Sequence, residues 1–541
     1  MEKSGKKNFQ LAGKINFFDS RKRNEYKSFI SNKTFDVLVI GGGITGAGIS
    51  LDASSRGLNT CLIDMNDFAS GTSSKSTKLI HGGLRYLEQF KFKLVNETGN
   101  ERAILSNIAP HLVKSEKMLL PIIKNGKLNK LSTRLALMVY DYLANVSKED
   151  KNKMLSKNDT FSQEPLLKSN NILGSAYYSE YRTDDSRLTI EVLKKSHELG
   201  ASPINYIKAI DFIYKKNKVV GVKCKDQLDG AILELYSKNI INASGSWTDE
   251  VLKGDEKKLV LSKGVHIVVS REKFNLSQSV YFDAIDKRMI FAIPREDKVY
   301  IGTTDTEFNK EKDSLLVLRD EVNYLLNSVN LTFSVLLKIE NVESSWVGLR
   351  PLIKDGNKKV SEVSREDEIF VSKKGIITIA GGKLTGYRKM AQRVIDLIFK
   401  KDNIRIRKSL TKNLKLYGNN YNKLKSQILD LGFTKDQFNK YYDNYGDECQ
   451  EIFSKIKERS KEDSILIISE YRFCIKNEMC HTLLDFFTQR NSMVYYKFDE
   501  VFPFINQNEK EMRKIADISD QKWKNQLDDL KKYMNQITTF N

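Results

Sequence analysis

A glycine-rich turn between an apolar run and a helical pattern constrains the fold of this chain more than any other feature. Residues 35–40 (FDVLVI) are apolar and β-branched, as expected of a strand buried in a parallel sheet. The turn GGGITG follows at 41–46, and residues 47–55 have the apolar period of a helix. A second strand is expected at 60–64. The order of these elements predicts a βαβ unit and an α/β fold.

The glycines of this turn have the G-x-G-x-x-G spacing of dinucleotide-binding loops. Gly41 permits the tight turn, Gly43 lets a pyrophosphate approach the backbone, and Gly46 lets the helix pack on the strand. The helix N-terminus offers free N–H groups to the phosphates. Asp64 ends the second strand 18 residues after Gly46, where a carboxylate accepts hydrogen bonds from ribose hydroxyls. The motif predicts a bound dinucleotide but does not separate FAD from NAD.

Composition excludes several classes of protein. Of 541 residues, 40% are hydrophobic and 29% charged, so the chain is neither disordered nor fibrous. No run approaches 18 apolar residues and the N-terminus has no apolar signal segment, so neither a spanning helix nor a secretory signal is expected. Five cysteines without a C-x-x-C pair favour reduced thiols in the cytoplasm. The net charge of +20 attracts polyanions, although a lysine-rich composition explains it equally well.

Beyond the glycine turn, ordered motifs resemble those of the FAD-dependent glycerol-3-phosphate dehydrogenases. The motifs are ASGTSSKST at 69–77, LIHGGLRYLE at 79–88, DDSRL at 184–188, NASGSW at 242–247, KGVH at 263–266, FAIP at 291–294, IGTTDT at 301–306, GLRPL at 348–352 and GGKLTGYR at 381–388. The resemblance is strong over 36–400. It is weaker over 401–500, where Glu478, Asp485 and Arg490 also fit the family. Ser244 and Ser246 depart from it, since the family usually has Thr and Pro there.

The resemblance implies an FAD-binding Rossmann-like domain of the glutathione-reductase and D-amino-acid-oxidase type, an interleaved α+β substrate domain and a helical C-terminal domain. The expected boundaries are a basic arm at 1–34, an FAD-binding domain at 35–110, 171–262 and 345–400, a substrate domain at 111–170 and 263–344, and a helical domain at 401–541. After 401, glycines become rare while lysine, aspartate, asparagine and aromatic residues dominate in helical periods.

The resemblance also implies the reaction. The C2 alcohol of sn-glycerol 3-phosphate is oxidised to dihydroxyacetone phosphate by hydride transfer from C2 to flavin N5. A membrane quinone is the expected electron acceptor; the alternative is an oxidase that uses O2 and releases H2O2. An amine or amino-acid oxidase with the same flavin framework is a second alternative. A nucleic-acid-binding function rests on charge alone, because no recognition motif is present.

By this resemblance the substrate and catalytic residues fall into three groups. The phosphate would be held by guanidinium forks and a tyrosine hydroxyl. These residues are Arg85, Tyr86, Arg350 and Arg365. One of two histidines, His81 or His266, would take the C2 hydroxyl proton, and the residues alone do not decide which. Lys383 would stabilise negative charge near the substrate or the flavin, and Arg350 would also be catalytic.

The cofactor-binding residues are expected in the glycine turn and in three later motifs. They are Gly41, Gly43, Ile44, Thr45, Gly46, Asp64, Ser70, Ser73, Ala243, Gly245, Gly382, Leu384 and Thr385. No metal is expected, and a homodimer is.

One segment bears on membrane binding. Lys124, Lys127, Lys130 and Arg134 precede the apolar run at 135–140. A basic, apolar and aromatic segment of this length suits a helix lying on anionic lipid. A helix packed on the substrate domain, with its lysines in solvent, explains the pattern equally well. The net charge of +20 on the whole chain favours the first interpretation, a cytoplasmic protein held peripherally on the inner face of the cytoplasmic membrane.

Overall fold

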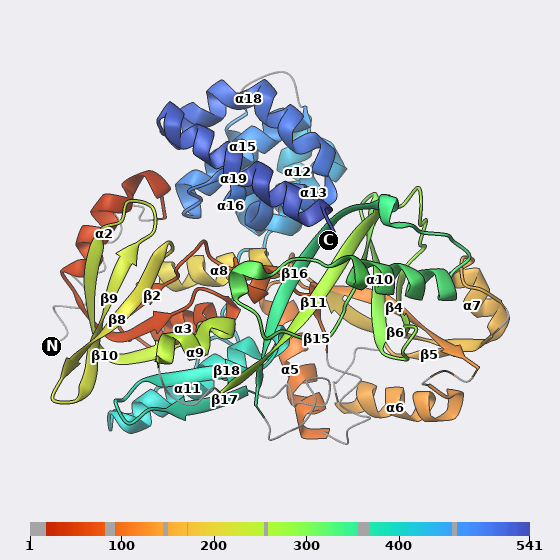
Figure 1. Ribbon diagram of the computed structural model, residues 1–541, viewed down its shortest axis with the longest axis horizontal. Helices are drawn as coiled ribbons and strands as arrows, with labels where there is room; N and C mark the ends of the chain where they lie inside the picture. Colours follow the sequence, from red (N-terminus) through yellow and green to blue (C-terminus); the bar gives the residue numbers. More distant parts are fainter. Residues whose placement is uncertain are drawn as a thin grey trace.

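The computed structural model describes residues 18–81, 92–124, 126, 128–143, 150–169, 171–253, 258–354, 367–456 and 462–540. Two large sheets lie side by side, and a group of C-terminal helices packs across one side of both (Figure 1). The predicted fold class is confirmed.

The first sheet contains the predicted βαβ unit. Its strand order is β17-β18-β10-β1-β2-β7, and the hairpin β8–β9 extends it from β10. The pairs β18–β10, β10–β1, β1–β2 and β2–β7 are all parallel. The strands are β1 Thr34–Ile40, β2 Thr60–Ile63, β7 Ser202–Ile204, β8 Ile207–Lys215, β9 Lys218–Asp226, β10 Ile232–Asn242, β17 Asp367–Val371 and β18 Ile377–Gly381.

Three helices pack with this sheet, and the central one, α3, contacts the other two. They are α3 Ile44–Ser55, α8 Asp185–Glu198 and α11 Tyr387–Lys401. Helix α3 begins three residues earlier than its apolar period indicates, because the glycine turn itself forms the first helical turn. The apolar residues of β1 and β2 are buried, as predicted from their β-branched composition.

The second sheet is mixed and mostly antiparallel. Its order is β15-β11-β14-β13-β12-β4-β6-β3, with β16 also pairing with β11 and β5 with β6. The strands are β3 Leu79–Ile80, β4 Lys114–Ile123, β5 Lys153–Leu155, β6 Ile172–Arg182, β11 Leu259–Ser270, β12 Ser279–Asp283, β13 Met289–Arg295, β14 Lys298–Gly302, β15 Thr306–Glu307 and β16 Val342–Ile353. Its helices are α5 Phe92–Ile108, α6 Lys130–Leu143, α7 Lys157–Gln163 and α10 Arg319–Thr332. Within the described residues, no helix has both the length and the apolarity to cross a bilayer.

The sheet pairing divides the chain differently from the predicted segments. Strands β3 and β6 and most of β16 lie in stretches that the sequence assigned to the FAD-binding domain, yet they pair within the second sheet. We therefore propose to count these three strands with the substrate domain. The domain boundaries themselves stay a prediction.

The C-terminal part has helices and no strands among its described residues, and its first helix after α11 begins at Tyr421. Its helices are α12 Tyr421–Asp430, α13 Lys435–Tyr445, α14 Cys449–Ser454, α15 Asp463–Asn477, α16 Leu483–Asp485, α17 Met493–Tyr496, α18 Val501–Ala516 and α19 Asp520–Thr538. Helices α17 and α19 contact β16. Trp346 of β16 packs edge-on against Tyr495 of α17, so the helices share a buried core with the second sheet.

Candidate active site

A cleft of about 910 Å³ lies at the carboxyl ends of the parallel strands. Ligands of open α/β sheets bind at this edge, and the volume is near the upper end of the ~300–1,000 Å³ usual for small-molecule sites. The cleft is lined by residues 207–212 of β8 and by residues 379–384, which form the end of β18 and the turn after it. The sequence-predicted residues that line it are Gly41, Gly43, Ile44, Thr45, Asp64, Ser70, Ser73, Ala243, Gly245, Gly382, Lys383 and Leu384.

The glycine turn is packed so closely that side chains are excluded. A Cβ on Gly46 would clash with the carbonyl of Gly41, and a Cβ on Gly41 would clash with the carbonyl of Ala243. Gly41 also has a φ of +115°, which favours glycine. The hydroxyl of Ser73 accepts a 2.9 Å hydrogen bond from the backbone N–H of Ile44, the first residue of α3. Ser73 therefore lies against a helix N-terminus, where dinucleotide phosphates bind.

Asp64 occupies the position predicted for a ribose ligand. One carboxylate oxygen accepts from the backbone N–H of Gly42 at 2.6 Å, and the other accepts from Asn66 at 2.9 Å. Burial raises the pKa of this carboxyl to about 7, while the two backbone hydrogen bonds lower it. The glycine cradle, the helix terminus and this carboxyl together fit an adenine dinucleotide such as FAD.

His81 and Lys383 meet just after strands β3 and β18, although 302 residues separate them in the chain. Lys383 Nζ lies 3.5 Å from His81 Nε2. The hydroxyl of Thr385 donates to the His81 carbonyl at 3.2 Å, which fixes the backbone there. Gly381 and Gly382, both with positive φ, turn the chain before Lys383. Lys383 lines the cleft, and His81 contacts Lys383 without being part of the described lining.

Arg350 and His266 lie on neighbouring antiparallel strands of the second sheet. Arg350 on β16 is paired with Ser262 on β11, four residues before His266. A Cβ on Gly264, between them on β11, would clash with the Arg350 guanidinium. The strand pairing thus places a cation and an imidazole on one face of the sheet.

His266 is 1% exposed and is held on two sides. Its Nε2 is 3.0 Å from the Thr77 hydroxyl, and its ring stacks on Trp346 at 4.9 Å. Burial lowers the pKa of His266 well below its usual range, and the charges of Arg350 and Lys78 lower it further. This imidazole is therefore neutral at physiological pH.

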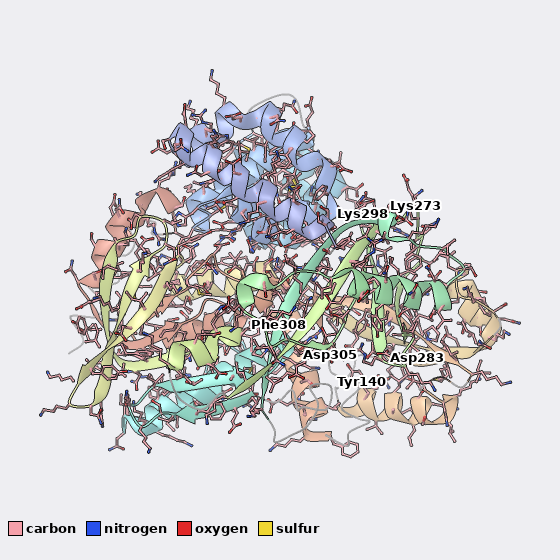
Figure 2. All side chains as sticks on the ribbon, viewed as in Figure 1. Tyr140, Lys273, Asp283, Lys298, Asp305 and Phe308 are labelled. Atoms are coloured by element: carbon pink, nitrogen blue, oxygen red, sulfur yellow. The ribbon has the colours of Figure 1, made fainter. Side chains whose placement is uncertain are left out.

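Arg350 is held by residues of the IGTTDT motif. Its Nη2 donates to the Thr303 hydroxyl at 2.9 Å, and its Nη1 contacts the Asp305 carboxylate at 3.2 Å. Asp305, labelled in Figure 2, comes from the turn before β15. The Ser262 hydroxyl also accepts from Nη1, at 3.2 Å. The sequence singled out the motif but not these contacts, because only the sheet brings its side chains to Arg350.

The remaining predicted residues are distributed as follows. Gly46 and Thr385 support the cleft from behind, through helix packing and the His81 carbonyl. His81, His266 and Arg350 lie beside the cleft without lining its described wall. Arg85, Tyr86 and Arg365 fall outside the described residues.

Comparison with known proteins agrees with this geometry. Residues 36–388 match the family described as FAD dependent oxidoreductase, and residues 409–522 match the C-terminal domain of alpha-glycerophosphate oxidase. The aerobic glycerol-3-phosphate dehydrogenase of Staphylococcus epidermidis is 44% identical over 509 residues, which are 90% of this chain and 91% of that protein. Its Staphylococcus aureus counterpart is 45% identical over 507 residues, 89% of this chain and 91% of that protein.

A solved structure of a glycerol-3-phosphate dehydrogenase also matches this chain over nearly its whole length. The glycerol-3-phosphate dehydrogenase from Bacillus halodurans, complexed with FAD, has a TM-score of 0.81 at 37% identity and covers 96% of this chain and 99% of its own. The predicted resemblance and the predicted cofactor are confirmed. The chain belongs to the FAD-dependent oxidoreductases and, within them, to the family of the aerobic glycerol-3-phosphate dehydrogenases.

Proposed function

We propose that this protein oxidises sn-glycerol 3-phosphate at C2 to dihydroxyacetone phosphate and passes the electrons to a membrane quinone. The observation that carries the proposal is the identity of 44–45% with aerobic glycerol-3-phosphate dehydrogenases over about nine-tenths of the chain. FAD, when bound, supplies the acceptor for the hydride that leaves C2. The side chains beside the cleft supply the grip on the phosphate, the base and the positive charge.

Arg350 is proposed to bind the substrate phosphate. Its guanidinium is oriented by Thr303, Asp305 and Ser262, so little side-chain entropy is lost when a phosphate binds. A planar guanidinium matches phosphate oxygens in a way that a lysine does not. Arg85, Tyr86 and Arg365 stay predicted partners of the same phosphate.

His81 is proposed as the base for the C2 hydroxyl. It lies beside the cleft-lining Lys383, whose ammonium is 3.5 Å from His81 Nε2. The same ammonium would stabilise the alkoxide that forms as the proton leaves. His266 suits this role less, because its pKa lies well below its usual range and a good base has a pKa near the working pH. We assign His266 to positioning.

The test is anaerobic mixing of the FAD-loaded protein with sn-glycerol 3-phosphate, followed by flavin absorbance. Prompt bleaching is expected, and a soluble quinone should then restore the colour faster than air does. Rapid recovery in air with stoichiometric H2O2 would instead support the oxidase alternative. Bleaching by glycine or another amino acid, with none by glycerol 3-phosphate, would overturn the proposal in favour of an amine oxidase.

Helix α6 supports a peripheral position at the cytoplasmic face of an anionic membrane. Its buried side carries Tyr140, labelled in Figure 2, which bonds to Glu180 of the second sheet. Its outer side exposes Leu131, Leu135 and Met138, which are 78%, 64% and 56% exposed and follow helical spacing. Lys130 and Arg134 flank this apolar stripe. The helix lies on the opposite side of the molecule from the C-terminal helices (Figure 1).

Vesicle binding tests this position. The protein should sediment with vesicles containing anionic phospholipid at low salt and be released at high salt, since exposed charges are screened. Leu135→Ser should weaken binding, while Leu331→Ser, a 61% exposed leucine on α10, serves as the matched control. Absence of sedimentation at low salt would contradict the proposed membrane binding. The homodimer predicted from the sequence is tested separately by analytical ultracentrifugation.

A further inference from the structure

A buried arginine of the C-terminal helices binds the loop that follows β2 of the first sheet. Arg490, at the end of the π-helical turn η9 (Phe486–Arg490), is 1% exposed. Its Nη1 donates to Asp67 Oδ2 at 2.7 Å and its Nη2 donates to Asp67 Oδ1 at 3.1 Å. Asp67 lies in the loop after β2, three residues beyond Asp64. A side chain 423 residues away in the chain thus forms a two-pronged bond with the loop that carries the predicted ribose ligand.

A second contact reaches the same part of the cleft wall through Tyr206. The Tyr206 hydroxyl donates to Asp485 Oδ1 at 2.5 Å. The backbone of Tyr206 donates to the Asn66 carbonyl at 3.0 Å, and the next residue, Ile207, donates to the Asp64 carbonyl at 2.6 Å. Tyr206 therefore connects the C-terminal helices to both strands that border the adenosine half of the cleft.

The two contacts are joined into one buried cluster. The Asn205 side-chain amide donates to Asp67 at 2.8 Å and to the Met479 carbonyl at 3.0 Å. Arg490 also donates to the Glu478 carbonyl at 2.8 Å. The Glu478 side chain receives a two-pronged bond from Arg187 of α8, at 2.7 and 2.8 Å. These buried polar groups satisfy one another's hydrogen bonds, so displacing any of them leaves a buried group without a partner.

The cluster ends one residue away from the cleft. Asp64, Asn66 and Ile207 line the cleft, whereas Arg490 and Asp485 are not part of its described lining. The contacts therefore run from the C-terminal helices to Asp67 and Tyr206, and from these to the wall that faces the adenosine half of a dinucleotide.

We infer that Arg490 and Asp485 are positioning residues for the cofactor. Through Asp67 and Tyr206 they fix the wall of the adenosine half, so the C-terminal helices contribute to FAD affinity without touching FAD. By thermodynamic reciprocity, bound FAD strengthens the docking of these helices. This gives the C-terminal region a role in holding the cofactor.

The test uses the full-length holoenzyme with Arg490→Lys and Tyr206→Phe. The first keeps the charge but loses the two-pronged bond, and the second removes only a hydroxyl. FAD dissociation is measured from flavin fluorescence on dilution, and ADP, which carries only the adenosine half, is titrated as a competitor of rebinding. We expect FAD affinity to fall about tenfold for Arg490→Lys and about threefold for Tyr206→Phe. ADP affinity should fall by the same factors.

Arg102→Lys is the matched control. Arg102 is also buried, and it bonds to Glu180 of the second sheet and to Tyr140 of α6, none of which lines the cleft. It should lower the melting temperature while leaving FAD and ADP affinity unchanged. If Arg490→Lys behaves in the same way, its role is purely structural and the inference is wrong. Should Arg490→Lys fail to fold, Tyr206→Phe decides alone, and unchanged ADP affinity in that variant rejects the inference. These binding measurements need no substrate turnover, so they are independent of the proposed reaction.

Discussion

Two imidazole–cation pairs lie near the cleft, and they are built in different ways. His266 and Arg350 come from neighbouring strands, and Arg350 hydrogen-bonds oxygens of the same sheet. His81 and Lys383 come from chain segments just outside strands β3 and β18, beside two glycines with positive φ. The strand-borne imidazole is 1% exposed, whereas His81 is only partly buried. In the proposed roles, the sheet pair binds the phosphate with a rigid guanidinium and the loop pair takes part in proton transfer.

Replacing each imidazole in turn tests which histidine acts as the base, and it should give the largest effect. His81→Gln should lower kcat about 10³-fold, because it removes the proposed base. His266→Gln should lower kcat only about tenfold, because it disturbs packing against Trp346 and Thr77. Steady-state kinetics with the FAD content checked by absorbance measures both. A larger loss from His266→Gln would reverse the two roles.

Lys383→Met should have the next largest effect. Loss of the cation should lower kcat about 10²-fold, the size expected when one group that stabilises an oxyanion is removed. FAD should be retained, since the glycine turn and Asp64 are untouched. The rate of anaerobic flavin bleaching measures this directly. Unchanged bleaching would reject the assignment of Lys383.

Arg350→Lys tests whether the Arg350 guanidinium binds the substrate phosphate. The lysine keeps the charge but cannot contact Thr303, Asp305 and a phosphate together, so KM should rise about thirtyfold with a smaller change in kcat. Arg472→Lys, a partly exposed arginine of α15 bonded to Glu511 of α18, is the control and should change neither constant. An unaltered KM for Arg350→Lys would place the phosphate elsewhere.

The smallest expected effect is a dependence of stability on pH, and it arises from the carboxyl of Asp64 rather than from the imidazoles. Asp64 has a folded-state pKa of about 7, above the ~3.9 of an unfolded aspartate. Its contribution to stability is therefore fully present below pH 4 and is lost as the pH rises to about 7. Burial shifts His266 the other way, since it lowers the pKa of that imidazole well below its usual value.

Melting of the FAD-free protein measures this effect. The melting temperature of the wild type minus that of Asp64→Asn should fall by a few degrees between pH 5 and pH 8. A constant difference would mean that Asp64 does not titrate in this range.

The cofactor half of the site was largely predictable from the sequence. The strand at 35–40, the glycine turn and Asp64 lie within 30 residues of one another, and their conformations depend on near neighbours. The contacts of Arg350 with Thr303 and Asp305 were not predictable in this way, because they depend on how β11 pairs with β14, β15 and β16. The grip of Arg490 on Asp67 had no sequence signal beyond the resemblance at that position.

The sequence alone determined the βαβ unit, the dinucleotide site, the helical C-terminal region and the set of candidate histidines, arginines and lysine. These features follow from local backbone preferences and side-chain spacing. Only the tertiary structure decided which of these residues meet and that His266 is buried, with its pKa lowered well below the usual range. The pKa of an imidazole depends on desolvation and on neighbouring charges, and both arise when strands and loops distant in the chain pack together.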